Sequence, residues 1–342
     1  MSVHAKPTTM KHIAERARVS LGTVSHVVNG TASVREKLRE RVLEAIDSLG
    51  YTPSQLARGL RRNSTNMLGM VIPDITNPFF PAVVRGVEDV AYRAFFHVVV
   101  CNADNDPAKE KGYIDALRSY RVAGLLVIPA TEKNPALQRA TPSSLGVPVV
   151  YLDRCPSDWK GDSVTVDNRL GAFQATEHLI KLGHKRLAML SGPRHLTNAI
   201  ERLGGFRKAL AKHKLTIEPE YIQETKFDRD SGHRSAMRLL SMLPRPTAIF
   251  AANDPVALGA LFAARELGLS CPRDVSIVGF DDAEYDTLTE PTLTSVHQSG
   301  YQMGATAARI LLERIQGKKE RAQQIVLPTE LKIRNSVGPP SS

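Results

Sequence analysis

Four consecutive residues near the N-terminus combine two hydroxyl groups, a leucine and a glycine at the start of a predicted helix. Ser20, Leu21, Gly22 and Thr23 open a short helix expected over 21–28, and a four-residue turn joins it to an earlier short helix. Two short helices with this spacing are typical of a helix-turn-helix, whose second helix lies in the major groove with its N-terminal side chains on base edges. The chemistry that these residues could support is recognition of base edges by hydrogen bonds and apolar contacts, without any reaction.

The acidic pair Asp281-Asp282 is the other grouping that could support chemistry. Adjacent strand residues point to opposite faces, so only one of the two can face a cleft. The ten histidines lack metal-ligand spacing, and Cys101, Cys155 and Cys271 match neither a disulfide framework nor a zinc site. The sequence also lacks a dinucleotide-binding glycine motif, a phosphate-binding loop, H-E-x-x-H and G-x-S-x-G. We therefore expect no catalytic residue, no metal and no cofactor.

Basic charge is concentrated at the start of the chain. Residues 1–66 hold eleven Lys or Arg against five acids, whereas all 342 residues have a net charge of +10. This imbalance favours a polyanion-binding head on a body with another task. No apolar stretch is long enough to span a membrane, and residues 1–9 do not form a signal peptide. We expect a cytoplasmic protein with no membrane contact.

Periodicity predicts an all-helical head. Thr9 can cap a helix over 10–17, Ser20 a second, and a third keeps an apolar face before it stops at Gly50. The residues expected to make internal contacts in this head are Ile13, Ala14, Val19, Val24 and Val27.

The rest of the chain alternates strands and helices. Apolar runs predict buried strands at 68–72, 96–101, 124–128, 147–152, 186–190, 248–252 and 275–280. Amphipathic stretches predict helices at 82–94, 108–119, 169–182, 203–213, 231–242, 255–267 and 300–316. This alternation is typical of the α/β class with parallel sheets, and its length suits two lobes.

The head resembles the LacI/GalR family of bacterial transcription regulators. The residues that carry the resemblance are Thr9-Met10-Lys11-His12-Ile13-Ala14, Val19-Ser20-x-x-Thr23-Val24-Ser25-His26-Val27-Val28-Asn29-Gly30 and Gly50-Tyr51-x-Pro53-Ser54-x-x-Ala57-Arg58-x-Leu60. The body is similar to the family's regulatory core, which has the periplasmic-binding-protein type I fold. Its matching motifs include Asn77-Pro78-Phe79-Phe80, Asp153-Arg154, Ser191-Gly192-Pro193, Asn253-Asp254-x-x-Ala257 and Val278-Gly279-Phe280-Asp281-Asp282.

The resemblance implies three parts. They are a DNA-binding head over 1–50, a hinge and linker over 51–66, and a two-lobed effector-binding and dimerisation core over 67–335. The family's chain crosses between its lobes three times, which implies that residues 299–320 return to the first lobe. Arg35 stands where family members commonly have a capping Ser or Thr, so Ser33 is expected to cap the third helix.

The resemblance also assigns DNA-binding residues. The base-reading positions are Leu21, Gly22 and His26, and the polar groups placed near phosphates are Ser20, Thr23, Ser25 and Asn29. In the hinge, which the family folds into a helix on its operator, the corresponding residues are Leu56, Ala57, Arg58 and Leu60. His26 stands where many members carry Arg. Histidine makes one hydrogen bond to a base where arginine can make two, so a different base preference is expected.

The effector residues are carried over in the same way. They are Phe79, Phe80, Asp153, Asn198, Arg202, Phe227, Asn253 and Asp281. Acids, amides and an arginine beside aromatic rings suit a sugar, although a purine could also stack there. Asn253 and Asp281 are the foremost candidates. For Asn77, Asp153 and Asp254 the alternative is helix capping or turn formation at strand ends.

These assignments predict a homodimeric repressor. Two heads would bind a near-palindromic DNA operator, and a small effector, expected to be a sugar, would bind between the lobes and alter operator affinity. The alternatives are a sugar-binding protein without a DNA function and a purine-responsive repressor. Whether the effector releases DNA or promotes binding stays open.

Overall fold

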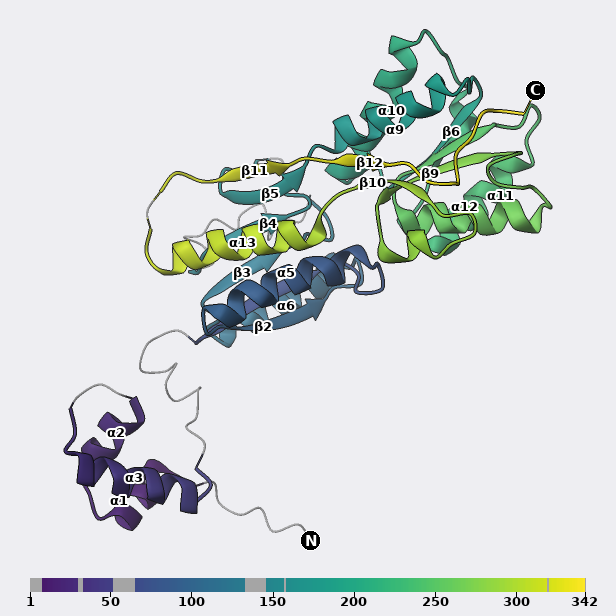
Figure 1. Ribbon diagram of the computed structural model, residues 1–342. Coiled ribbons are helices and arrows are strands. Elements are labelled where there is room, and N and C mark those ends of the chain that lie inside the picture. The colour runs from purple at the N-terminus through teal and green to yellow at the C-terminus, as the bar shows by residue number, and fades with distance from the viewer. Residues whose placement is uncertain are drawn as a thin grey trace. The chain divides into compact units, whose positions relative to one another are not determined.

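The computed structural model separates into two compact units, residues 1–65 and 66–342, and each is described by itself (Figure 1). The residues that the structure describes are 8–29, 33–51, 65–132, 146–156, 158–318 and 320–341, without the side chain of Asn29.

Three helices form the first unit around a small apolar core. They are α1 (Met10–Ala17), α2 (Leu21–Asn29) and α3 (Glu36–Ser48). The contacts expected from the sequence are confirmed: Ile13, Ala14 and Val24 are buried in this core, and Val19 and Val27 pack against it.

The predicted N-terminal cap is confirmed for α2 and wrong for α3. The Thr23 amide donates a hydrogen bond to Ser20 Oγ at 3.1 Å, which confirms Ser20 as the cap of α2. The residue that precedes α3 is Arg35, and its side chain makes no capping hydrogen bond. The expected cap by Ser33 is therefore wrong. A capping hydroxyl has to stand directly before the first helical turn, and Ser33 lies two residues too early.

The first lobe of the second unit is a parallel six-stranded sheet in the order β11-β5-β4-β3-β1-β2. Its strands are β1 (Met67–Ile72), β2 (His97–Asn102), β3 (Gly124–Val127), β4 (Val149–Leu152), β5 (Asp162–Val166) and β11 (Gln324–Leu327). Its helices are α5 (Phe79–Arg93), α6 (Pro107–Ser119) and α13 (Gly300–Ile315). Successive residues of β1 serve opposite faces: Met70 packs with α5 and α13, and Val71 packs with α6.

The second lobe repeats this plan in the order β12-β10-β9-β8-β6-β7, parallel except for β12 against β10. Its strands are β6 (Leu187–Ser191), β7 (Ile222–Glu224), β8 (Ala248–Ala251), β9 (Ser276–Asp281), β10 (Thr294–His297) and β12 (Glu330–Lys332). Its α-helices are α9 (Asn168–Lys181), α10 (Thr197–Lys212), α11 (Arg229–Leu240) and α12 (Asp254–Glu266), and its two 3₁₀ turns are η1 (Pro219–Tyr221) and η2 (Glu284–Thr287).

The chain crosses between the lobes three times, as predicted. The crossings run from β5 to α9, from β10 to α13 and from β11 to β12 (Figure 1). The second crossing returns α13 to the first lobe, where it lies against α5. The two helices approach so closely that a Cβ on Gly304 would lie 2.0 Å from the Val83 carbonyl oxygen, and one on Gly86 would lie 2.1 Å from that of Tyr301. Glycine is required at both positions.

All seven predicted strands are present, and β5, β7, β10, β11 and β12 are additional. The missed strands are short, of three to five residues, and several have polar ends that a search for apolar runs passes over. None of the helices in the described ranges is long and apolar enough to cross a membrane.

Candidate functional site

The exposed side of α2 carries the residues assigned to base reading. Leu21 is 51 % exposed, and Gly22 and His26 also face solvent. The Ser20 and Thr23 hydroxyls lie 2.9 Å apart in a hydrogen bond at the start of the helix. Their observed role is therefore local, at a helix N-terminus whose free amides and dipole favour phosphate.

The other residues assigned to DNA binding are Ser25 and Asn29 on α2 and four residues of the hinge. Ser25 is half-buried on α2. The side chain of Asn29 and the four hinge residues Leu56, Ala57, Arg58 and Leu60 lie outside the described residues. Their assignments stay predictions.

In the second unit, all eight residues predicted to bind the effector line one cavity between the lobes. The cavity is narrow: the volume open to the centre of a water-sized sphere is about 30 Å³, which holds about two water molecules. Phe79 and Phe80 open α5 in the first lobe, and Asp153 follows β4. The others come from the second lobe, where Asn253 follows β8 and Asp281 ends β9. The carboxyl ends of parallel strands thus surround the cavity, as in other open α/β sheets.

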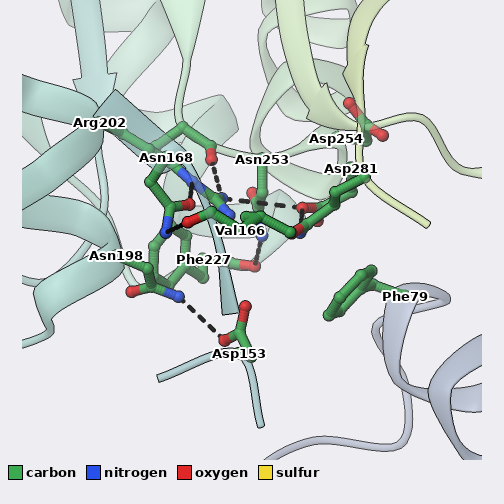
Figure 2. A network of polar contacts seen from close by, with 12 residues as sticks. Phe79, Asp153, Val166, Asn168, Asn198, Arg202, Phe227, Asn253, Asp254 and Asp281 are labelled. Atoms are coloured by element: carbon green, nitrogen blue, oxygen red, sulfur yellow. Dashed lines mark hydrogen bonds and ion pairs between the residues drawn. The ribbon is translucent and has the colours of Figure 1, made fainter. Parts of the chain in front are cut away.

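Arg202 is fixed by a network of buried partners (Figure 2). Its Nε donates to Asn168 Oδ1 at 2.9 Å, and its Nη1 donates to the Ala252 carbonyl oxygen at 2.6 Å. Its guanidinium carbon lies 3.7 Å from the centre of the Phe280 ring. Burial lowers the pKa of Arg202, and the nearby Asp281 carboxylate opposes that shift. The network presents a positive charge in a fixed orientation, which suits a directional hydrogen bond to a ligand oxygen.

Asp281 is the acidic counterpart of Arg202. Its Oδ1 lies 3.7 Å from Arg202 Nη1 and accepts a hydrogen bond from Gln298 Nε2 at 2.6 Å. Burial raises the pKa of Asp281 well above its ordinary value, and Arg202 counteracts only part of that shift. The cavity wall therefore contains a carboxyl group held towards its neutral form.

Hydrogen bonds link the two lobes beside the cavity. Asn198 Nδ2, from α10, donates to Asp153 Oδ2 at 3.0 Å, and Figure 2 shows these side chains facing each other. Glu132, in the loop after β3, accepts from the backbone amide of Thr197 at 2.7 Å and from the Thr197 hydroxyl. A ligand that contacts Asp153 or Asn198 would act directly on a contact between the lobes.

Asn253 has a structural role in addition to its place in the cavity. Its Oδ1 accepts from the Val256 amide at 3.1 Å and caps α12, while Nδ2 donates to the Phe227 carbonyl oxygen at 3.0 Å. A carboxamide has two acceptor positions and two hydrogens, so one of each is left for a ligand. The Phe227 ring needs Gly192, because a Cβ there would lie 2.1 Å from the ring.

The capping alternatives have mixed outcomes. Asn77 Oδ1 accepts from the Phe79 amide, two residues along the chain, at 3.0 Å, as in a turn formed by an asparagine side chain, and Asn77 also lines the cavity. Asp254 lies outside the cavity lining, where its carboxylate accepts from the Ser295 hydroxyl at 2.6 Å and from the Ala283 amide at 2.9 Å. Asp153 lines the cavity with a left-handed backbone (φ 62°), which is typical of a turn.

Six residues that line the cavity are not among the eight predicted from the sequence. They are Asp74, Asn77, Asn105, Arg154, Lys226 and Gln298. Arg154 follows the predicted residue Asp153 directly in the Asp153-Arg154 motif, so the motif could have indicated Arg154 as well. Gln298 comes just after β10. Because this strand was not predicted, the sequence did not place Gln298 at a strand end.

Asp282 does not join Asp281 in the cavity. Its two carboxylate oxygens contact His297 Nδ1 at 3.0 Å and Arg334 Nη2 at 2.6 Å instead. The expectation that only one of the two acids faces the cleft is confirmed. Within the described residues, no group of three or more His, Cys, Asp or Glu side chains could hold a metal ion. The arrangement is one of ligand recognition.

A helix-turn-helix unit joined in one chain to a two-lobed parallel-sheet body with a polar cleft defines an effector-controlled DNA-binding regulator. The family model of the bacterial regulatory proteins of the lacI family matches residues 9–54, and that of the periplasmic binding protein-like domain matches residues 176–337. The chain belongs to the lacI family: it is a DNA-binding transcriptional repressor with an effector domain, and this family is not one of enzymes.

Individual relatives match over nearly the whole chain. The HTH-type transcriptional repressor PurR of Haemophilus influenzae (strain PittEE) is 39 % identical over 334 residues, 96 % of this chain and 98 % of that protein. The lac repressor dimer bound to operator and the anti-inducer ONPF superposes with a TM-score of 0.86 at 30 % identity, covering 97 % of this chain and all of that one. A complex of the transcriptional regulator CelR with cellobiose gives a TM-score of 0.74 at 32 % identity, with coverage of 96 % and 99 %. These matches confirm the fold and the family predicted from the sequence.

Proposed function

We propose that this repressor is controlled by a sugar-like effector, a small molecule with several hydroxyl groups, bound between its lobes. One observation carries the proposal: of the fourteen described residues that line the cavity, eleven are polar or charged. They surround the cavity from both lobes with carboxylates, amides and guanidinium groups. A sugar has hydroxyl groups on every side, and each of them needs a donor or an acceptor when it is buried.

The aromatic residues are consistent with this class of ligand. The Phe79 and Phe80 rings meet edge to face, with centres 5.5 Å apart and planes at 69°. Those two rings therefore do not form one flat wall for a wide planar base. A single ring face is enough to pack against the apolar side of a sugar. Among the similar structures, one holds cellobiose and another, from Enterococcus faecium and 31 % identical, holds ribose.

A purine is the second candidate. It is favoured by the 39 % identity to PurR proteins, which are named as repressors, and by the presence of phenylalanines from both lobes, Phe79 and Phe227, in one cavity. The edge of a purine would form hydrogen bonds with Asp281 and Arg202, and one of its faces would stack on a phenylalanine ring. Compared with a sugar it would leave more of the polar wall unpaired, which is costly in a buried site.

On the DNA side, we propose that the protein acts as a homodimer on a near-palindromic operator in the cytoplasm. Leu21, Gly22 and His26 would contact base edges, and the hydroxyls of α2 would contact phosphates. Leu56, Ala57, Arg58 and Leu60 would bind through the hinge over 51–66, between a head over 1–50 and a core over 67–335.

Two measurements test this function. Selection from random duplex DNA should yield a site with two-fold symmetry, and an asymmetric site or no enrichment would contradict the operator proposal. Thermal unfolding of the full-length protein with ribose, glucose, galactose, cellobiose, hypoxanthine and guanine tests the effector, because a specific ligand raises the melting temperature by mass action. A shift with hypoxanthine or guanine alone would replace the sugar by a purine.

A further inference from the structure

Arg154 is a buried arginine with one donor, its Nε, that makes no hydrogen bond to the described residues. It is 4 % exposed and lines the effector cavity. Its Nε is buried and has no hydrogen-bond partner in the described part of the chain. The carboxylate oxygen of its ion pair, Asp153 Oδ2, lies 3.9 Å from Nε, beyond hydrogen-bond reach.

The neighbouring acids are turned to other partners. Asp153 accepts the hydrogen bond from Asn198, and Glu132 accepts from the Thr197 amide at the start of α10. Arg154 therefore differs from Arg202, whose guanidinium is held by Asn168 and the Ala252 carbonyl group. A buried charged group without hydrogen bonds is costly, and this cost falls when a ligand supplies the acceptor.

The charges on the wall indicate which acceptor fits. Three cations line the cavity, Arg154, Arg202 and Lys226, together with three acids, Asp74, Asp153 and Asp281. Because burial raises the pKa of Asp281 well above its ordinary value, its carboxyl group is held towards the neutral form. These six charges cancel when all are ionised, and a neutral Asp281 would leave one positive charge that a ligand with one negative charge would balance.

We propose that the effector carries an anionic oxygen group, a carboxylate or a phosphate, and that Arg154 binds it. Arginine offers Nε and an Nη on one edge of a planar fork, which matches two oxygens of such a group. The inference rests on the proposed function, since it names the class of sugar: a sugar acid or a sugar phosphate. It also makes Arg154, which follows the end of β4, the residue that selects the charged effector.

The test compares neutral and anionic ligands on the full-length protein. The probes are glucose, glucuronate and glucose 6-phosphate, then galactose, galacturonate and galactose 6-phosphate, then ribose and ribose 5-phosphate. Thermal unfolding ranks them, and calorimetric titration gives the dissociation constants. We expect an anionic member to bind at least tenfold more tightly than its neutral counterpart. Preference for the acid or for the phosphate identifies which source supplies the group.

Variants separate a ligand contact from a structural role. Arg154→Gln should remove the preference for the anion, with a loss of about ten- to a hundredfold in its affinity. Arg154→Lys keeps the charge without the fork and should retain part of the preference; it also serves if the glutamine variant does not fold. Arg273→Gln is the matched control, because Arg273 is exposed and pairs with its neighbour Asp274.

The outcomes separate this inference from the proposed function. Neutral sugars that bind as tightly as their anionic counterparts would overturn the inference and leave the sugar effector in place. An anion preference that survives Arg154→Gln would overturn the role of Arg154. Binding of purines alone, or of none of the probes, would overturn the sugar effector and the inference together.

Discussion

Replacing Asp281 with alanine tests the centre of the proposed effector site. The substitution removes a carboxyl group that is 6 % exposed, that accepts from Gln298 Nε2 at 2.6 Å and that lies 3.7 Å from Arg202 Nη1. We expect a large loss of effector affinity. The other carboxylate at the end of β9, that of Asp282, is paired with His297 and Arg334. It therefore cannot replace Asp281 as the acceptor for an effector hydroxyl.

The magnitude follows from the cost of an unpaired buried group. A hydroxyl left without its acceptor in the closed cavity costs about 1–3 kcal/mol, which corresponds to about a five- to 150-fold loss of affinity. The loss of the Gln298 and Arg202 contacts occurs in the free and in the bound protein. Losing these two protein contacts therefore lowers the free energy of unfolding but adds little to the loss of effector affinity.

The assay measures operator binding by fluorescence anisotropy while the effector is titrated, with the strongest ligand from the thermal screen and the selected operator. For Asp281→Ala, the effector concentration at half-response should rise about fivefold or more. Operator affinity without effector should stay near that of the wild type, because the base-reading helix belongs to the other unit. Asp282→Ala is the matched control and should respond normally. A normal response of Asp281→Ala, or an equal loss in Asp282→Ala, would refute the assignment.

Five further changes probe the head, the hinge and a buried acid. His26→Arg should alter the preferred operator base in a selection experiment, and an unchanged site would contradict base reading by this residue. Arg58→Ala should weaken binding to all sequences alike and reduce the salt slope of log affinity by about one. In mobility-shift titrations, Leu60→Ala should weaken specific binding more than non-specific binding. Gly59 lies in the same hinge, which is expected to become a helix on the operator, so Gly59→Ala should tighten operator binding by up to about 1 kcal/mol. Burial raises the pKa of Asp286 to about 7. Between about pH 4 and pH 7 the folded state therefore binds a proton that the unfolded state has released. The free energy of unfolding falls as pH rises through this range, by about 1.4 kcal/mol per pH unit at most. Asp286→Asn should therefore raise the melting temperature at pH 8 more than at pH 5, and an equal shift at both would show that the acid is not protonated there.

Much of the architecture was predictable from the sequence because local chemistry determines it. The apolar run 248–252 fits a strand covered on both faces, and Ile249 and Phe250 do pack on opposite sides of their sheet. Ser20 caps α2 because its hydroxyl has to reach only three residues along the chain. The eight effector candidates converge on one cavity because they follow motifs at strand ends, which a parallel sheet gathers at one edge.

The tertiary structure decided what depends on contacts between distant segments. Gln298 meets Asp281 because β10 pairs with β9 so that His297 lies opposite Asp281, and β10 is too short to be found by its pattern. Arg154 is an ordinary basic residue in the sequence. It becomes distinctive only where burial removes water and the neighbouring acids are already bonded to residues of the other lobe. Burial and pairing are properties of the assembled lobes, so no window of sequence contains them.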